Sequence, residues 1–294
     1  MRRKNSRLVT AAAGVMMVCT LFFTACERAS NNTQPSRLSI YLTDGASRYS
    51  AVWIDLQKLY IVTGNGSDSA LWDLPLTKTG AYNLVGQPGG TDTLLTTKEL
   101  PATNISKVRL VLGNDNKIVL KDGSMQPLVL PGGNAQETVL DLKVNLLLSP
   151  GGQYELVLDI NLPRSIIPAA DSSSYSLNPV IRTFPRGSNG KLSGTVAPAG
   201  ICPQVLALTG NDTLLALPDS SSGNYLFPTA LSGTYELRFM TDSLEGYRPD
   251  TLGNIQVTSG NTTEVDTMFL QPVAVDSSAL PPSDTLTLPP VGIR

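Results

Sequence analysis

Short segments with two-residue hydrophobic alternation, separated by turn sequences, run through most of this 294-residue chain. In the first half, apolar side chains recur at every second position within residues 38–42, 52–56, 108–112 and 154–160. This period places the apolar side chains on one face of a strand. Turn sequences such as Gly64-Asn65-Gly66 and Pro150-Gly151-Gly152 separate the segments. Because no amphipathic helical pattern exceeds two turns, we predict an all-β fold made of antiparallel β-sandwiches.

A second alternating set follows a segment rich in Pro, Gly and Asn at residues 184–190, which is typical of a domain boundary. Its expected strands are residues 192–196, 204–209, 224–227, 234–240, 255–257 and 265–270. We therefore predict two β-sandwich domains, and a proline-rich tail after them. The predicted ranges are 1–25 for a signal peptide, 26–36 for a tether, 37–186 and 189–271 for the two domains, and 272–294 for the tail.

The first 26 residues have the pattern of a bacterial lipoprotein signal. A basic stretch containing Arg2, Arg3 and Lys4 precedes an apolar run at residues 8–23, and small residues lead to Cys26. We predict that Cys26 is lipidated, with acyl chains such as palmitate holding the protein to a membrane. An uncleaved transmembrane span is the alternative, but it needs about 20 apolar residues. The predicted location is the bacterial cell envelope, most consistent with the outer membrane.

Composition excludes several kinds of chemistry. The chain contains no histidine, which removes Ser-His-Asp and Cys-His arrangements and the commonest metal ligand. Of three cysteines, Cys19 leaves with the signal and Cys26 is acylated, so Cys202 has no disulfide partner within the mature chain. A net charge of −2 argues against a nucleic-acid partner. We expect no catalytic site, no metal and no cofactor.

Two family resemblances follow the same division. The first domain resembles the family catalogued as domain of unknown function 4382, through the sequences Leu38-Ser39-Ile40-Tyr41-Leu42-Thr43-Asp44, Tyr82-Asn83-Leu84-Val85, Leu158-Asp159-Ile160-Asn161 and Asn178-Pro179-Val180-Ile181-Arg182. This resemblance implies a β-rich module outside the cytoplasm and no catalytic residues. Residues 189–271 resemble the carboxypeptidase regulatory-like, or transthyretin-like, sandwich through Ser193-Gly194-Thr195-Val196, Gly223-Asn224-Tyr225-Leu226-Phe227 and Gly233-Thr234-Tyr235. Such domains are spacers or adhesion modules.

A triplet of Asp, then Ser or Thr, then an apolar residue recurs along the chain. It resembles the acceptor site for O-glycosylation in the envelopes of some Gram-negative bacteria, where sugars add a bulky, solubilising surface. The other interpretation is that Asp-Ser and Asp-Thr form Asx turns before strands. The candidate acceptor hydroxyls belong to Ser69, Thr93, Thr213, Ser243, Thr251, Thr267 and Thr285.

Other polar and aromatic residues are candidates for binding or catalysis. Trp53 and Trp72 are candidates for sugar stacking, although packing is the commoner role for tryptophan. Four carboxylates are candidates for a glycosidase pair, but a solvated sheet face explains them better; they are Glu137, Asp141, Glu155 and Asp159. Three aspartates have the carboxylate oxygens that calcium binds, but their sequence context is more typical of turns. They are Asp44, Asp115 and Asp122.

We predict a lipid-anchored envelope protein that acts as a non-catalytic binding, adhesion or structural module, with a glycan or another envelope protein as its ligand. The alternative is a fimbria-like pilus subunit that polymerises by strand exchange. An envelope hydrolase is the third possibility, and the absence of histidine and of a nucleophile motif disfavours it.

Overall fold

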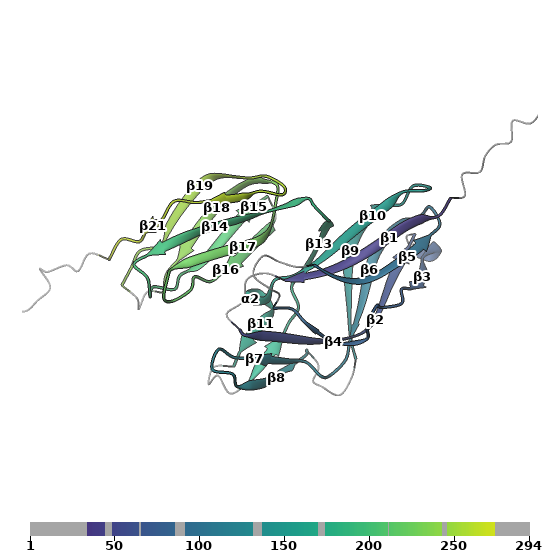
Figure 1. Ribbon diagram of the computed structural model, residues 1–294, viewed down its shortest axis with the longest axis horizontal. Coiled ribbons are helices and arrows are strands. Elements are labelled where there is room, and N and C mark those ends of the chain that lie inside the picture. The colour runs from purple at the N-terminus through teal and green to yellow at the C-terminus, as the bar shows by residue number, and fades with distance from the viewer. Residues whose placement is uncertain are drawn as a thin grey trace, which may run out of the picture.

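The computed structural model describes residues 34–44, 49–64, 66–85, 92–131, 137–169, 174–210, 212–242 and 246–273. These residues form two β-sandwiches arranged along the long axis of the molecule, with separate hydrophobic cores (Figure 1). One core is built from residues between Leu38 and Leu177, and the other from residues between Leu192 and Leu270. The predicted all-β sandwich class is confirmed.

The first sandwich consists of a four-stranded sheet packed on a nine-stranded sheet. The smaller sheet has the order β13-β10-β1-β5, and the larger has the order β11-β12-β8-β7-β2-β6-β9 with β3 and β4 also paired to β2. Their bounds are β1 Ser36–Asp44, β2 Ala51–Thr63, β3 Ala70–Asp73, β4 Gly80–Asn83, β5 Thr93–Leu100, β6 Asn104–Leu112, β7 Lys117–Val119, β8 Met125–Val129, β9 Thr138–Leu147, β10 Gln153–Ile160, β11 Ile166–Pro168, β12 Tyr175–Leu177 and β13 Ile181–Pro185.

Helix is confined to two short pieces within the described residues, η1 (Gly66–Asp68) and α2 (Leu162–Ser165). The α2 turn begins where the Asn161 side chain accepts a hydrogen bond from the backbone N–H of Arg164, with Pro163 in the first turn. No helix in the described part of the chain is long and apolar enough to cross a membrane.

The second sandwich packs sheet β17-β14-β20, with β21 also paired to β14, on sheet β16-β15-β18-β19. Its strands are β14 Asn189–Ala197, β15 Gln204–Thr209, β16 Asp212–Ala216, β17 Asn224–Leu231, β18 Gly233–Met240, β19 Asp250–Val257, β20 Thr262–Glu264 and β21 Met268–Phe269. Tyr225, Phe227 and Phe239 form edge-to-face pairs at the centre of this core, with ring centroids 5.9 to 6.0 Å apart.

Strand pairing differs from the prediction in three respects. Most pairs are antiparallel as predicted, but β1 runs parallel to β10, and β14 runs parallel to β20 and β21. The strand predicted at residues 265–270 is instead two short strands, β20 and β21, on either side of residues 265–267. Strand β16 was not predicted, and neither were the strands β3, β4, β5, β7, β8, β9, β11, β12 and β13 of the first sandwich.

Candidate functional site

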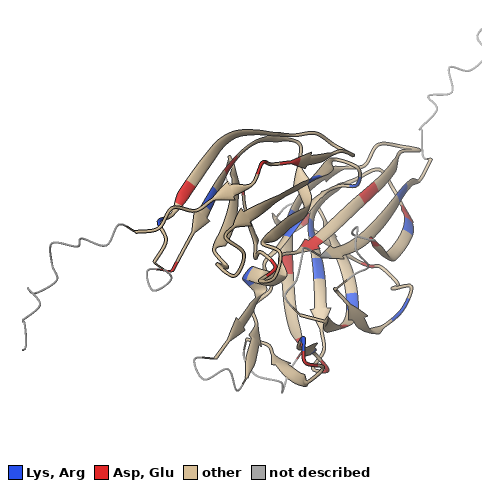
Figure 2. Ribbon diagram, turned by 60° about the vertical axis from the view of Figure 1, so that its left-hand side comes forward, with Lys and Arg blue, Asp and Glu red and all other residues tan. Residues whose placement is uncertain are grey.

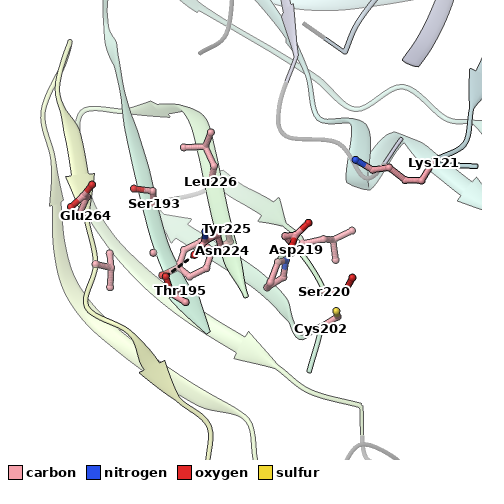
Figure 3. Close-up of a pocket in the computed structure, with 14 residues that line it drawn as sticks. Lys121, Ser193, Thr195, Cys202, Asp219, Ser220, Asn224, Tyr225, Leu226 and Glu264 are labelled. Carbon is pink, nitrogen blue, oxygen red and sulfur yellow. Dashed lines mark hydrogen bonds between the residues drawn. The ribbon is translucent and has the colours of Figure 1, made fainter. Parts of the chain in front are cut away.

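An open groove of about 920 Å³ lies over the second sandwich where it faces the first. Strands β14, β17 and β20 form one wall, and Lys121, in the turn between β7 and β8, reaches it from the first sandwich (Figure 3). Lys121 therefore makes this a groove to which both sandwiches contribute.

Strand register determines which side chains line the groove. Ser193 of β14 lies opposite Leu226 of β17 and Glu264 of β20, and Thr195 lies opposite Asn224. Directly opposed residues share one face of a sheet, so this outward face presents hydroxyl, amide and carboxylate groups beside an apolar Leu226. The Thr195 hydroxyl donates a hydrogen bond of 2.9 Å to the Asn224 side-chain oxygen (Figure 3).

One end of the groove is formed by a tight turn after Pro218. Oδ1 of Asp219 accepts hydrogen bonds from the backbone N–H groups and hydroxyls of Ser221 and Ser222. These bonds lower the pKa of Asp219 to about 2, and the bond from the Ser221 hydroxyl has the largest effect. Asp219 therefore places a permanent negative charge beside the groove.

The floor of the groove depends on Gly194. A Cβ at this position would lie 2.4 Å from the hydroxyl oxygen of Tyr225, which sits beneath it in the core. That hydroxyl is buried and has no hydrogen-bond partner, and burial raises the pKa of Tyr225 to about 12. Tyr225 therefore stays protonated, and its aromatic ring serves mainly to fill the core.

A buried polar cluster joins the two sandwiches next to the groove. We call Asp159, Arg182, Asp212 and Thr229 the junction cluster. Nε of Arg182 donates to Asp159 at 2.7 Å within the first sandwich, while its Nη1 donates to Asp212 of the second at 2.8 Å. The Thr229 hydroxyl donates to the same Asp159 oxygen, 2.9 Å away. One arginine therefore bridges a carboxylate from each sandwich.

Asp159 corrects a sequence-based expectation. Its side chain does point out of its own sheet, as the alternation of β10 predicts, but it is only 2% exposed, so the solvated-face interpretation is wrong for this residue. The second sandwich covers it. Burial raises the pKa of Asp159, and the effects of Arg182 and Thr229, which lower it, do not cancel this. Its Oδ1 atom has no partner.

The other three carboxylates that were candidates for a glycosidase pair are not gathered around a cleft, and acidic residues are spread over both sandwiches (Figure 2). Glu155 accepts a hydrogen bond from the Tyr41 hydroxyl and lies near Arg186. Asp141 lies on the larger sheet, where it accepts two hydrogen bonds from Arg109 of the neighbouring strand β6. Glu137 lies 3.9 Å from Lys58.

The two tryptophans do not form a joint platform. Trp53 and Ile61 both belong to β2, and Trp72 is paired with Ile61, so the tryptophans are about 26 Å apart along the sheet. A bulge after Leu56 reverses the alternation of β2 between these positions. Trp72 packs against the first core and donates a hydrogen bond from Nε1 to Thr63. Trp53, which is half-buried on the other side of the sheet, remains the better stacking candidate.

The described Asp-Ser/Thr triplets share one structural position. Each lies at the start of a strand, where β3, β5, β16, β19 and β21 begin. This supports their interpretation as strand-initiating sequences. Ser69, Thr93, Thr251 and Thr267 are exposed, and Thr213 is half-buried. Ser243 and Thr285 lie outside the described residues.

The other predicted positions follow local structure. Cys202 is an exposed free thiol in the loop before β15, at the groove. Asp115 lies 3.4 Å from Lys117, and Asp122 accepts hydrogen bonds from Ser124 in a turn. No group of three or more potential metal ligands occurs among the described residues. Cys26 and the side chain of Asp44 lie outside them.

Comparison with known proteins identifies the first sandwich but not a function. Residues 35–179 match the family described as Domain of unknown function (DUF4382), as the sequence predicts. No curated protein matches the chain.

Solved structures give distant likenesses only. The TIE protein of Bacillus anthracis is 12% identical with a TM-score of 0.23, over 77% of this chain and 35% of that one. A minor pilin of Streptococcus agalactiae is 11% identical with a TM-score of 0.22, over 88% and 100%. A family CBM26 protein of Eubacterium rectale in complex with maltoheptaose is 13% identical with a TM-score of 0.20, over 82% and 98%. Similarities this low carry no functional argument.

Proposed function

We propose that this chain, whose residues 35–179 match the DUF4382 family, is a lipid-anchored envelope protein that binds a polar ligand without transforming it. The anchor is the acylated Cys26, and residues 27–36 connect it to the first sandwich. The observation that carries the binding role is the groove, because its hydroxyl, amide and carboxylate groups lie on a rigid sheet face.

The groove chemistry suits a neutral, hydroxyl-rich ligand such as an oligosaccharide. Asn224 and Glu264 offer the amide and carboxylate groups that hydrogen-bond vicinal hydroxyls, and Leu226 offers an apolar contact. Asp219, which is ionised, lies beside the groove and opposes an anionic ligand. The ligand we propose is therefore a neutral glycan of the envelope or of a neighbouring cell.

Binding is tested with a glycan array probed by the chain and by two variants. Ser193→Tyr places a ring in the groove, and Gln256→Tyr places one on β19 of the opposite sheet as the control. We expect Ser193→Tyr to lose at least 10-fold in affinity for a bound glycan and Gln256→Tyr to retain it. Equal binding by both variants would exclude the groove as the site.

Anchoring is tested by the intact mass and N-terminus of the protein isolated from its host. We expect an N-terminus at Cys26 carrying two or three acyl chains. Increments of sugar mass would show that some of the triplets are glycosylated. An N-terminus well beyond Cys26 would instead favour the assembling pilus-like subunit, and the anchor proposal would fail.

A further inference from the structure

Strand β9 is a long edge strand of the larger sheet, and its pairing with β6 is regular from Thr138 to Lys143. It is ten residues long, alternates strictly between half-buried and exposed positions, and contains neither glycine nor proline. It pairs only with β6 in the described part of the chain, and β13, the edge strand of the other sheet, is not hydrogen-bonded to it. An edge of this kind exposes a row of free N–H and C=O groups.

Two other edges of the first sandwich are protected. Strand β11, at the opposite end of the same sheet, is three residues long and ends in Pro168. The edge of β5 is covered by residues 75–77, which lie between β3 and β4. The N–H of Thr77 donates to the carbonyl of Leu95, and the Thr96 hydroxyl donates to the carbonyl of Pro75, both at 2.7 Å. The contrast makes β9 the candidate for pairing with another chain.

The core beneath β9 is also incompletely covered. Its inward row packs against the first core but stays half-exposed, whereas the inward residues of the central strands are buried. That row consists of Leu140, Leu142, Val144 and Leu146. An added strand at this edge would cover these four side chains and satisfy the free backbone groups together.

Charges on the outward face of β9 identify the partner. Asp141 is held by Arg109 of β6 and also lies 3.4 Å from Lys107 of that strand. Lys143 lies directly opposite Lys107 and makes no ion pair among the described residues. Directly opposed like charges are destabilising. If two copies of β9 pair antiparallel about Leu142, Lys143 of each faces Asp141 of the other, and the inner rows match Leu140 with Val144.

We propose that β9 is a self-association edge, at which two copies of this chain join their large sheets through antiparallel pairing centred on Leu142. The register pairs Asp141 with the second copy's Lys143 twice, once on each side of the two-fold axis. Pairing displaced by two residues would instead bring Lys143 opposite itself, so the charges select the register.

The register is tested by disulfide crosslinking of the whole chain in its host, with Cys202→Ser removing the exposed thiol. Leu142→Cys places thiols across the axis, where opposed Cβ atoms are about 5 Å apart. Leu140→Cys is the matched control, since its two copies would be about 13 Å apart along the strands. We expect at least 10-fold more dimer from Leu142→Cys, with the Cys202→Ser parent as baseline.

The charge argument is tested in the Leu142→Cys background. Lys143→Asp creates a pair with Lys107 within the chain but two repulsive contacts with Asp141 between chains, so crosslinking should fall at least 10-fold while the melting temperature is kept. Lys98→Asp, on β5 of the smaller sheet, should leave the yield unchanged. Absence of a Leu142→Cys dimer, equal dimer from Leu140→Cys, or crosslinking insensitive to Lys143→Asp would each overturn the proposal.

Discussion

Arg182 holds the two sandwiches together because one guanidinium satisfies groups from both. It donates to Asp159 in the first sandwich and to Asp212 and the Thr229 hydroxyl in the second. Removing one partner of a buried ion pair leaves the other charge without compensation. We therefore expect Arg182→Ala to lower the free energy of unfolding by about 3–5 kcal/mol, measured by chemical denaturation.

Two further variants isolate the charge effect. Arg238 pairs with Glu236 on the surface, so Arg238→Ala should change the free energy of unfolding by no more than about 1 kcal/mol. Adding Asp159→Asn to Arg182→Ala should recover part of the loss, because no unpaired buried carboxylate remains. An Arg182→Ala variant as stable as Arg238→Ala would contradict this role for the cluster.

The raised pKa of Asp159 predicts a specific pH dependence. Because burial raises this pKa above its ordinary value of 3.8, the folded protein keeps a proton that the unfolded chain has already lost. The contribution of Asp159 to the free energy of unfolding therefore decreases as pH rises from its ordinary pKa to its raised pKa in the folded protein. The decrease is at most about 1.4 kcal/mol per pH unit, and the contribution is constant above the folded pKa.

This dependence is measured as the difference in free energy of unfolding between the wild type and Asp159→Asn over a pH series. We expect the wild type to lose stability relative to the variant as pH increases from about 4. A relative gain with rising pH would mean that Arg182 and Thr229 outweigh burial and that the pKa is lowered.

At the scale of elements, Gly223 shows how one turn positions the groove. Its φ is +75°, and a Cβ there would lie 2.1 Å from the carbonyl oxygen of Val196 on β14. Gly200 also has a positive φ, +96°, but has open space around it. Both alanine variants share the backbone penalty of about 1–2 kcal/mol. We expect Gly223→Ala to lose at least about 1 kcal/mol more because of overlap.

The measurement can separate the two sandwiches. Both tryptophans, Trp53 and Trp72, belong to the first sandwich, so tryptophan fluorescence reports its unfolding alone, while far-ultraviolet circular dichroism reports both. Gly223→Ala should therefore move the circular dichroism transition more than the fluorescence transition. Equal losses for Gly223→Ala and Gly200→Ala would show that β14 yields to the added methyl group.

Alternation predicted individual strands well because it depends only on which face meets the core. The segments at residues 38–42 and 108–112 lie within β1 and β6. Alternation did not reveal the bulge after Leu56 in β2, which requires knowledge of the pairing with β6. It also missed β16, where Thr213 and Leu215 are half-buried and the pattern is short. Parallel pairing of β1 with β10 joins residues too far apart in sequence for local patterns to show.

At the scale of the whole molecule, the site could not be predicted because it depends on how two domains meet. The alternation of the sequence correctly places Asp159 on the outer face of β10. That face is buried only because the second sandwich covers it. Likewise nothing near Lys121 in the sequence connects it with Ser193 or Glu264. Single-residue candidates such as Trp53 were accessible to sequence reasoning, whereas the groove and the junction cluster were not.

The junction cluster predicts a fixed angle between the sandwiches. Beyond the contacts of Arg182, Nη1 of Arg164 in α2 donates to the backbone carbonyl of Thr213 in β16 at 2.9 Å. Interfaces between domains allow motion unless such contacts oppose it. The groove spans the same junction, so loss of the cluster should move Lys121 relative to the groove wall.

Distances between spin labels test this. One label is attached to the native Cys202 and the other to Ser67→Cys, an exposed position in η1, with Cys19→Ser and Cys26→Ser removing the other two thiols of the chain. We expect a narrow distance distribution in this parent, a clearly broader one after Arg182→Ala, and no change after Arg238→Ala. The broadening should accompany weaker ligand binding in the groove, because the Lys121 side chain then samples many positions relative to the groove wall. A distribution equally narrow in all three proteins would mean that apolar packing alone sets the angle.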